Sequence, residues 1–144
     1  MKWVALVTWV LTAGGGFVML GVWLKNGGMR QGAQPGDRIR PPRILSHFAL
    51  AAIGLVLWIV YVAADEDGLA WAALVLLAIV AALGFSMLAI WLRQGSHRPA
   101  GAPGPTDDAV PAERHFPNVV VAVHGLVAAV TLVLVFLVAI GVGE

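Results

Sequence analysis

Two histidines and two methionines are the residues of this sequence whose types and spacing suggest chemistry. His47 stands in the apolar segment SHFALAAIG and His124 in VHGLVAAV, while Met19 and Met87 occupy matching places in GFVMLGVWLK and GFSMLAIWLR. Imidazole nitrogens and thioether sulfurs are ligands for transition metals. An imidazole in hydrocarbon also needs a partner, because an unsatisfied buried polar group costs several kcal/mol. The four residues therefore predict a metal or cofactor site, provided that the surrounding elements bring them together.

The composition places these residues in a lipid bilayer. The chain has 144 residues, of which 60% are hydrophobic and 12% charged, and its mean hydropathy is +0.87. A helix needs roughly 20 predominantly apolar residues to cross a bilayer, and four runs reach that length. We predict an all-α integral membrane protein, a four-helix bundle whose transmembrane helices cover approximately residues 3–24, 42–64, 69–92 and 117–142.

Several classes of site and partner are excluded by composition. The chain has no cysteine, which excludes disulfides, thiolate metal sites and iron–sulfur clusters. Its net charge of +1 gives no reason to expect a nucleic-acid partner. The first apolar run is longer than the roughly 7–15 residues of a signal-peptide core, so we expect it to be a retained helix.

Basic residues gather on one side of the predicted bundle. The loops at residues 25–41 and 93–116 are rich in glycine and proline, which predicts irregular connectors. Positive charge in short loops marks the cytoplasmic side of a membrane. We therefore expect both loops in the cytoplasm and both termini outside, in a cytoplasmic (inner) membrane. The basic residues in or next to these loops are Lys25, Arg30, Arg38, Arg40, Arg43, Arg93, Arg98 and Arg114, and the opposite side has Lys2, Asp65, Glu66 and Asp67.

An internal repeat relates the two halves of the chain. Residues 16–25 and 84–93 are identical at six of ten positions, including one methionine and one tryptophan. The first and third predicted helices therefore look like copies of one another. We infer two tandem helical hairpins, at about residues 1–64 and 69–142, which have the same topology and are related by a pseudo-two-fold axis along the membrane normal.

The second helix of each half repeats the order of proline and histidine. His47 follows Pro42 by five residues and His124 follows Pro117 by seven. A rival alignment keeps the 68-residue offset of the first helices and matches His47 with His115, but it leaves His115 in front of a proline, near the membrane interface. We favour His124 as the partner of His47.

Helix geometry places the candidate ligands in one layer of the membrane. At about 1.5 Å per residue, His47 lies about 8 Å and His124 about 10 Å inside the cytoplasmic ends of their helices. Met19 and Met87 come to about 9 Å by the same rise. One turn deeper, the repeat has two glycines that leave space for a flat ligand or a close helix neighbour, Gly16 and Gly84. The nearest side-chain partners for the histidines, judged by depth, are Ser46, Ser86 and Asn118.

This arrangement is suited to a b-type haem. A six-coordinate haem iron takes one axial ligand on each face, and a four-helix bundle can supply them from facing helices. The haem carboxylates would then pair with arginines at the cytoplasmic rim, namely Arg43, Arg93 or Arg114.

The chain resembles, in architecture, the small four-helix bis-histidine b-type cytochromes of respiratory membranes, with His47 in SHFALAAIG and His124 in VHGLVAAV as the matching residues. The resemblance implies electron transfer, with quinone or a respiratory complex as partner. Many such cytochromes bind two haems with four helical histidines. This sequence has no histidine in the outer half of its helices, which indicates a single haem.

Two other functions use the same residues differently. His47, His124, Met19 and Met87 would also make a two-imidazole, two-thioether site for Cu(I), which soft thioethers select. Alternatively, the histidines only form hydrogen bonds between helices, and the protein is an accessory subunit of a larger membrane complex or a homo-oligomer.

Transport and hydrolysis have less support in the sequence. Transporters of charged solutes usually place several polar or charged groups within their helices, and these helices have few. Asp107, Asp108 and Glu113 form an acidic group in the second basic loop, which we expect to be solvated. His97 is expected to be a solvated loop residue as well.

Overall fold

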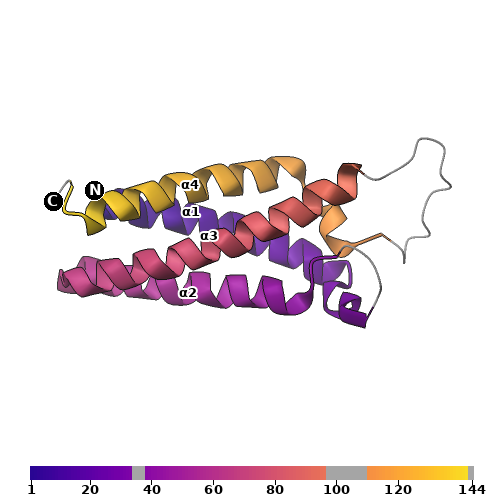
Figure 1. Ribbon diagram of the computed structural model, residues 1–144, viewed down its shortest axis with the longest axis horizontal. Coiled ribbons are helices and arrows are strands. Elements are labelled where there is room, and N and C mark those ends of the chain that lie inside the picture. Colours follow the sequence, from indigo (N-terminus) through magenta and orange to yellow (C-terminus); the bar gives the residue numbers. More distant parts are fainter. Residues whose placement is uncertain (34–37, 97–109, 143–144) are drawn as a thin grey trace.

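The computed structural model describes residues 1–33, 38–96 and 110–142. Four long helices run alternately up and down as a bundle (Figure 1): α1 (Lys2–Lys25), α2 (Pro41–Ala64), α3 (Asp67–Ser96) and α4 (Asn118–Ala139). Two short 3-10 helices lie in the connections, η1 (Gly28–Ala33) and η3 (Ala112–His115). Each long helix is long and apolar enough to cross a membrane. The predicted all-α, four-helix membrane fold is confirmed.

The helix ends follow the backbone preferences of particular residues. α2 begins at Pro41, because a proline at the first helical position loses no intrahelical hydrogen bond. It ends at Ala64, and the C-cap residue Asp65 adopts a left-handed conformation with φ of 59°. α4 ends three residues before the predicted boundary, and the chain then turns at Gly141, whose φ of 80° suits glycine. α3 continues to Ser96, beyond the predicted end at residue 92.

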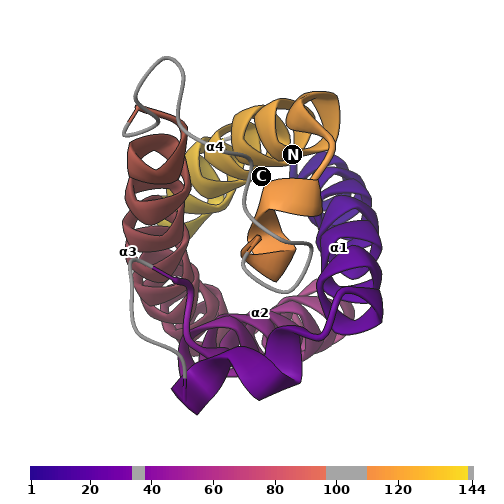
Figure 2. The ribbon, with the colours of Figure 1, turned by 90° about the vertical axis from the view of Figure 1, so that its right-hand side faces the viewer.

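The four helices form a ring in the order α1, α2, α3, α4 when the bundle is viewed along its axis (Figure 2). α1 packs chiefly against α4, and α2 packs chiefly against α3. α2 and α4 are therefore diagonal neighbours, as are α1 and α3. Both termini lie at the same end of the bundle as the turn between α2 and α3 (Figure 1).

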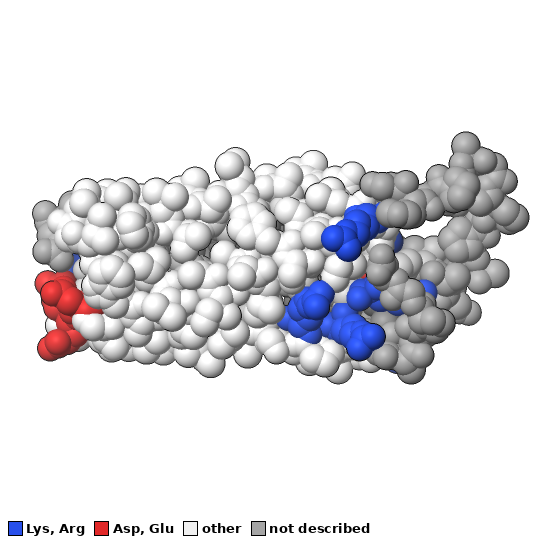
Figure 3. All heavy atoms as spheres, viewed as in Figure 1, with Lys and Arg blue, Asp and Glu red and all other residues white. Residues whose placement is uncertain are grey.

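Charge separates to the two ends of the molecule. Figure 3 shows acidic side chains at one end, basic side chains at the other and an uncharged surface between them. We call these the acidic end, formed by Asp65, Glu66 and Asp67, and the arginine-rich end, formed by Lys25, Arg30, Arg38, Arg40, Arg43, Arg93 and Arg114. At the acidic end, the Lys2 ammonium pairs with the Asp65 carboxylate.

The close-packed core lies in the half of the bundle nearer the acidic end. Trp9 and Trp58 have ring centres 6.3 Å apart, and Trp58 and Tyr61 have ring centres 4.9 Å apart. All three side chains are at most 3% exposed. This aromatic core fills the interior from α1 and α2, and α3 and α4 pack smaller residues against it, including Ala70, Ala73, Leu77, Val135 and Val138.

Burial repeats between the two halves of the chain with constant offsets. Buried residues of α1 and α3 match at a separation of 68 residues, and those of α2 and α4 match at 77 residues. The matching pairs are Ala5 with Ala73, Trp9 with Leu77, Gly54 with Thr131, Trp58 with Val135, and Tyr61 with Val138. The two halves therefore use equivalent helix faces to form the core.

The half nearer the arginine-rich end is packed differently. No residue is fully buried in four facing stretches that the structure describes completely: 10–22 of α1, 42–53 of α2, 81–94 of α3 and 118–130 of α4. Each stretch spans about 18–21 Å at 1.5 Å per residue. Every residue of these stretches keeps part of its surface exposed, unlike the residues of the aromatic core. Both helical histidines lie in these stretches.

Glu113 closes the arginine-rich end. Its side chain is fully buried, and its Oε1 accepts hydrogen bonds from the Ile39 amide and from Gln94 Nε2, both at 2.7 Å. The Trp91 indole donates to the Glu113 carbonyl at 3.1 Å. The prediction of a solvated Glu113 was wrong, because this carboxylate joins the segment before α2 to the end of α3. Asp107, Asp108 and His97 lie outside the described residues.

Candidate metal or cofactor site

His47 and His124 face one another across the bundle from the diagonal helices α2 and α4. Their ring centres are 6.4 Å apart and their ring planes meet at 56°. Each histidine is the seventh residue of its helix, which puts both about 9 Å from the helix start at 1.5 Å per residue. Both side chains are half-buried.

Each imidazole is anchored to the main chain of the neighbouring helix. His47 Nδ1 lies 3.0 Å from the Val80 carbonyl of α3, and His124 Nδ1 lies 2.9 Å from the Thr12 carbonyl of α1. A carbonyl oxygen only accepts, so Nδ1 is the protonated nitrogen in both rings. Nε2 then has the lone pair, and neither Nε2 has a hydrogen-bond partner among the described residues.

The repeat glycines explain how the rings reach these carbonyls. Gly84 follows Val80 by four residues, and Gly16 follows Thr12 by four. A helical side chain covers the turn that precedes it, so a glycine four residues later leaves the carbonyl open to an outside donor. A Cβ added to Gly84 would lie 3.3 Å from His47 Cε1, and one added to Gly16 would lie 3.5 Å from His124 Cε1. Both glycines thus form the surface against which an imidazole packs.

The hydrogen-bond partners of the histidines differ from the side chains that the sequence places at the same depth in the membrane. Ser46, Ser86 and Asn118 were the nearest candidate side chains, but both ring hydrogen bonds go to main-chain carbonyls. The Ser86 hydroxyl instead donates to the Leu83 carbonyl of its own helix at 2.6 Å. Sequence reasoning missed the roles of Thr12 and Val80, although their position four residues before the repeat glycines was a usable signal.

The remaining predicted site residues are two methionines, on α1 and α3, and three arginines at the arginine-rich end. Met19 and Met87 are half-buried and keep the 68-residue offset of the repeat. Arg43, Arg93 and Arg114 are exposed at the arginine-rich end, and the Arg114 guanidinium lies over the Trp91 ring at 6.0 Å.

His115 takes no part in the histidine pair. It is exposed at the end of η3, and its Nδ1 lies 3.3 Å from the Ala112 carbonyl. The ring that faces His47 across the bundle is that of His124.

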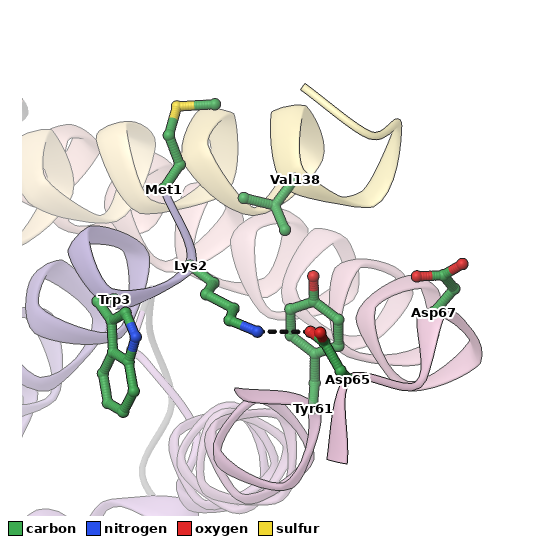
Figure 4. A pocket seen from close by; sticks show the side chains of 7 residues that line it. All are labelled: Met1, Lys2, Trp3, Tyr61, Asp65, Asp67 and Val138. Carbon is green, nitrogen blue, oxygen red and sulfur yellow. Dashed lines mark hydrogen bonds and ion pairs between the residues drawn. The ribbon is translucent and has the colours of Figure 1, made fainter. Parts of the chain in front are cut away.

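A separate cavity of about 370 Å³ opens at the acidic end (Figure 4). Lys2 and Asp65 pair within it, and the Lys2 ammonium lies 5.8 Å from the centre of the Tyr61 ring. Tyr61 follows His47 by fourteen residues, which is about 21 Å along α2. The cavity is therefore distinct from the histidine pair. Its lining residues are Met1, Lys2, Trp3, Tyr61, Asp65, Asp67 and Val138.

The number of donors limits the group that the histidine pair could hold. Among the described residues there is no group of three or more histidine, cysteine, aspartate or glutamate side chains that could hold a metal ion. A protein zinc site normally needs three or four such ligands, whereas a haem supplies four nitrogens of its own and takes one or two from the protein. No protein-family model, no curated protein and no solved structure matches this chain.

Proposed function

We propose that this chain is a membrane electron-transfer protein that binds one b-type haem between His47 and His124. The observation that supports this most directly is the pairing of the two imidazoles. Two imidazoles that face one another from opposite sides of the bundle could hold one haem iron between them, each through one ring nitrogen. The two rings lie 6.4 Å apart.

The hydrogen bonds of the rings also fit metal ligation. Metal-bound histidines almost always donate their second ring nitrogen to a carbonyl or carboxylate, which fixes the tautomer and the ring orientation. Val80 and Thr12 supply such carbonyls here. The backbone thus keeps Nε2 of each ring available as the ligand atom, without requiring another polar side chain in the membrane.

The packing of this half of the bundle fits a bulky apolar group. Residues around the histidines are not fully buried, whereas the half nearer the acidic end is filled by Trp9, Trp58 and Tyr61. Gly16 and Gly84 let each imidazole pack directly against the backbone of the neighbouring helix. We therefore expect the chain to bind one haem, because the aromatic core fills the half of the bundle nearer the acidic end, where a second haem would have to lie.

Bound haem supplies a one-electron iron couple, and the protein residues position it. His47 and His124 would ligate the iron. Arg43, Arg93 and Arg114, which are exposed at the arginine-rich end, would neutralise its carboxylates. With the arginine-rich end in the cytoplasm and the termini outside, as the positive-inside rule favours, the haem lies near the inner face of the cytoplasmic membrane, where a quinone or a respiratory complex would exchange electrons with it.

A structural role is the second candidate. The Nδ1 hydrogen bonds join α2 to α3 and α4 to α1, and such bonds between membrane helices stabilise a bundle by about 1 kcal/mol each. In that case the chain is an accessory subunit of a larger membrane complex or a homo-oligomer, and the histidines hold no cofactor.

Absorption spectroscopy of the detergent-purified protein, expressed with ample haem, distinguishes these functions. The haem proposal predicts a reduced spectrum of low-spin b-type haem at about one haem per chain, lost in His47→Ala and in His124→Ala but kept in His115→Ala. A flat visible spectrum in the wild-type protein would contradict it. Metal analysis of the same sample tests Cu(I), for which copper bound in proportion to protein would replace the haem assignment.

A further inference from the structure

The cavity at the acidic end brings together charged side chains from three parts of the bundle. Lys2 comes from α1, Asp65 follows α2, and Asp67 stands in the first turn of α3. All three line the cavity, whose volume is about 370 Å³. Sites that bind small molecules have volumes of roughly 300–1,000 Å³. The three side chains therefore present one ammonium and two carboxylates to a ligand of modest size.

The two carboxylates differ in their partners. The Asp65 carboxylate pairs with the Lys2 ammonium (Figure 4). The Asp67 side chain is exposed and has no hydrogen bond or ion pair among the described residues. Asp67 is consequently available to a cationic group that enters the cavity.

The Lys2 ammonium can contact an anion without leaving Asp65. An ammonium carries three N–H donors, and the Lys2 side chain is 30% exposed. A phosphate oxygen can therefore approach it and accept a charge-assisted hydrogen bond. A ligand with both a phosphate and an ammonium would thus place each of its charges beside an opposite one.

The position of the cavity indicates which molecule carries these two groups. The acidic end terminates four helices that are long and apolar enough to cross a membrane (Figure 3), so it lies at the level of the lipid headgroups. Trp3, which lines the cavity, is 65% exposed, and Val7 and Leu11 are 58% and 63% exposed. Residues four apart share one face of a helix. An acyl chain can lie on this apolar face of α1 while its headgroup occupies the cavity.

We propose that this cavity binds the headgroup of phosphatidylethanolamine, with the phosphate against Lys2 and the primary ammonium against Asp67. A primary ammonium both donates hydrogen bonds to a carboxylate and pairs with its charge. The quaternary ammonium of phosphatidylcholine has no N–H group, and the headgroup of phosphatidylglycerol has no cation, so both should bind less tightly. The site is separate from the histidine pair and does not require a haem there.

Lipid binding to the full chain tests this inference. The detergent-purified protein is titrated separately with the dioleoyl forms of phosphatidylethanolamine, phosphatidylcholine and phosphatidylglycerol, and bound lipid per chain is read by native mass spectrometry. We expect one phosphatidylethanolamine per chain, bound about tenfold more tightly than the other two lipids. Asp67→Asn removes the charge beside the ammonium and should abolish most of this preference. The matched control is Glu66→Gln, which removes a neighbouring carboxylate that does not line the cavity and should leave the preference unchanged.

Lys2→Gln should weaken the binding of all three lipids, because each has a phosphate, but it also breaks the ion pair with Asp65. Asp67→Asn leaves that pair intact and is the decisive variant. Equal affinity for the three lipids would overturn the inference. The same loss in Glu66→Gln as in Asp67→Asn would also overturn it, because it would indicate a general attraction to the acidic end.

Phosphoethanolamine without acyl chains, added as a competitor, separates a lipid from a soluble ligand. We expect it to displace phosphatidylethanolamine only in large excess, because it cannot use the apolar face of α1. Displacement at equal concentration would assign the cavity to a soluble ligand and overturn the lipid assignment.

Discussion

A single glycine decides whether an imidazole from one helix can reach the main chain of the next. A side chain four residues later would cover the carbonyl oxygens of Val80 and Thr12, and Gly84 and Gly16 leave these oxygens open to the imidazoles. Their carbonyls already serve the hydrogen bonds of their own helices, yet a carbonyl oxygen has two lone pairs and can accept a second donor. The Nδ1–H groups of both histidines are thus satisfied in lipid by main-chain atoms, which every residue has.

Replacing these glycines should affect the two histidines unequally. In Gly84→Ala the new Cβ would lie 3.3 Å from His47 Cε1, which is tight for a ring fixed by a hydrogen bond, while in Gly16→Ala the distance to His124 Cε1 is an ordinary 3.5 Å. We expect Gly84→Ala to lower the free energy of unfolding of the purified protein by about 1 kcal/mol and to reduce the amount of haem that it retains. Both effects should be smaller for Gly16→Ala.

Gly14→Ala is the matched control, since an added Cβ at Gly14 meets no atom within 4 Å. Differential scanning fluorimetry and the visible spectrum measure both effects. Equal behaviour of the three alanine variants would contradict the role assigned to Gly84.

At the scale of elements, η3 acts as a cap on the arginine-rich end. Its Glu113 accepts from the main chain before α2 and from Gln94 on α3, and Trp91 donates to its carbonyl. Three segments far apart in the sequence therefore meet at one fully buried carboxylate.

Removing the Glu113 carboxylate should loosen this cap. In Glu113→Ala the Ile39 amide and Gln94 Nε2 lose a common acceptor, and an unsatisfied buried donor costs about 1–3 kcal/mol. We expect a loss of stability in that range in a denaturant titration, together with faster hydrogen exchange at the Ile39 amide. Glu66→Ala, at the exposed turn of the acidic end, should leave both measurements unchanged. Normal exchange at Ile39 in Glu113→Ala would show that the cap does not depend on this carboxylate.

The four helices could be predicted from the sequence, whereas the cap that η3 forms through Glu113 could not. Four apolar runs of spanning length predict four helices because a bilayer imposes length and composition on any helix that crosses it. The layer shared by His47 and His124 followed from counting helical rise. Glu113, in contrast, stands in a glycine- and proline-rich connector whose composition predicts solvent exposure, and only the fold brings Ile39 and Gln94 to it. The Nδ1 partners, the carbonyls of Val80 and Thr12, were missed for a related reason. Every residue has a main-chain carbonyl, so the residue type does not indicate which one accepts a hydrogen bond.

At the scale of the whole molecule, charge is confined to the two ends. The arginine-rich end and the acidic end are separated by an uncharged surface over the length of the four helices (Figure 3). Such a distribution predicts that the arginine-rich end faces the cytoplasm, because basic residues in short loops are enriched on that side of a membrane.

The orientation can be tested with single cysteines, because the chain has none of its own. We expect Glu66→Cys to react with a membrane-impermeant maleimide in intact cells. Arg40→Cys should react only after the cells are permeabilised. The reverse pattern would place the arginine-rich end outside and contradict the predicted topology. A detergent-solubilised sample, in which both cysteines should react, controls for accessibility.

The equivalence of the two histidine contacts also bears on the ancestry of the fold. Thr12 and Gly16 hold His124, and Val80 and Gly84 hold His47, so each half supplies both a glycine-bearing helix and a histidine for the other half. Two identical copies of a two-helix hairpin, arranged about a two-fold axis, would form the same pair of contacts. The chain thus has the form expected from duplication and fusion of a gene for a homodimeric hairpin. A fused pair of hairpins can also differ between its halves, as Phe48 after His47 and Gly125 after His124 do here, whereas the two faces of a homodimer must be identical.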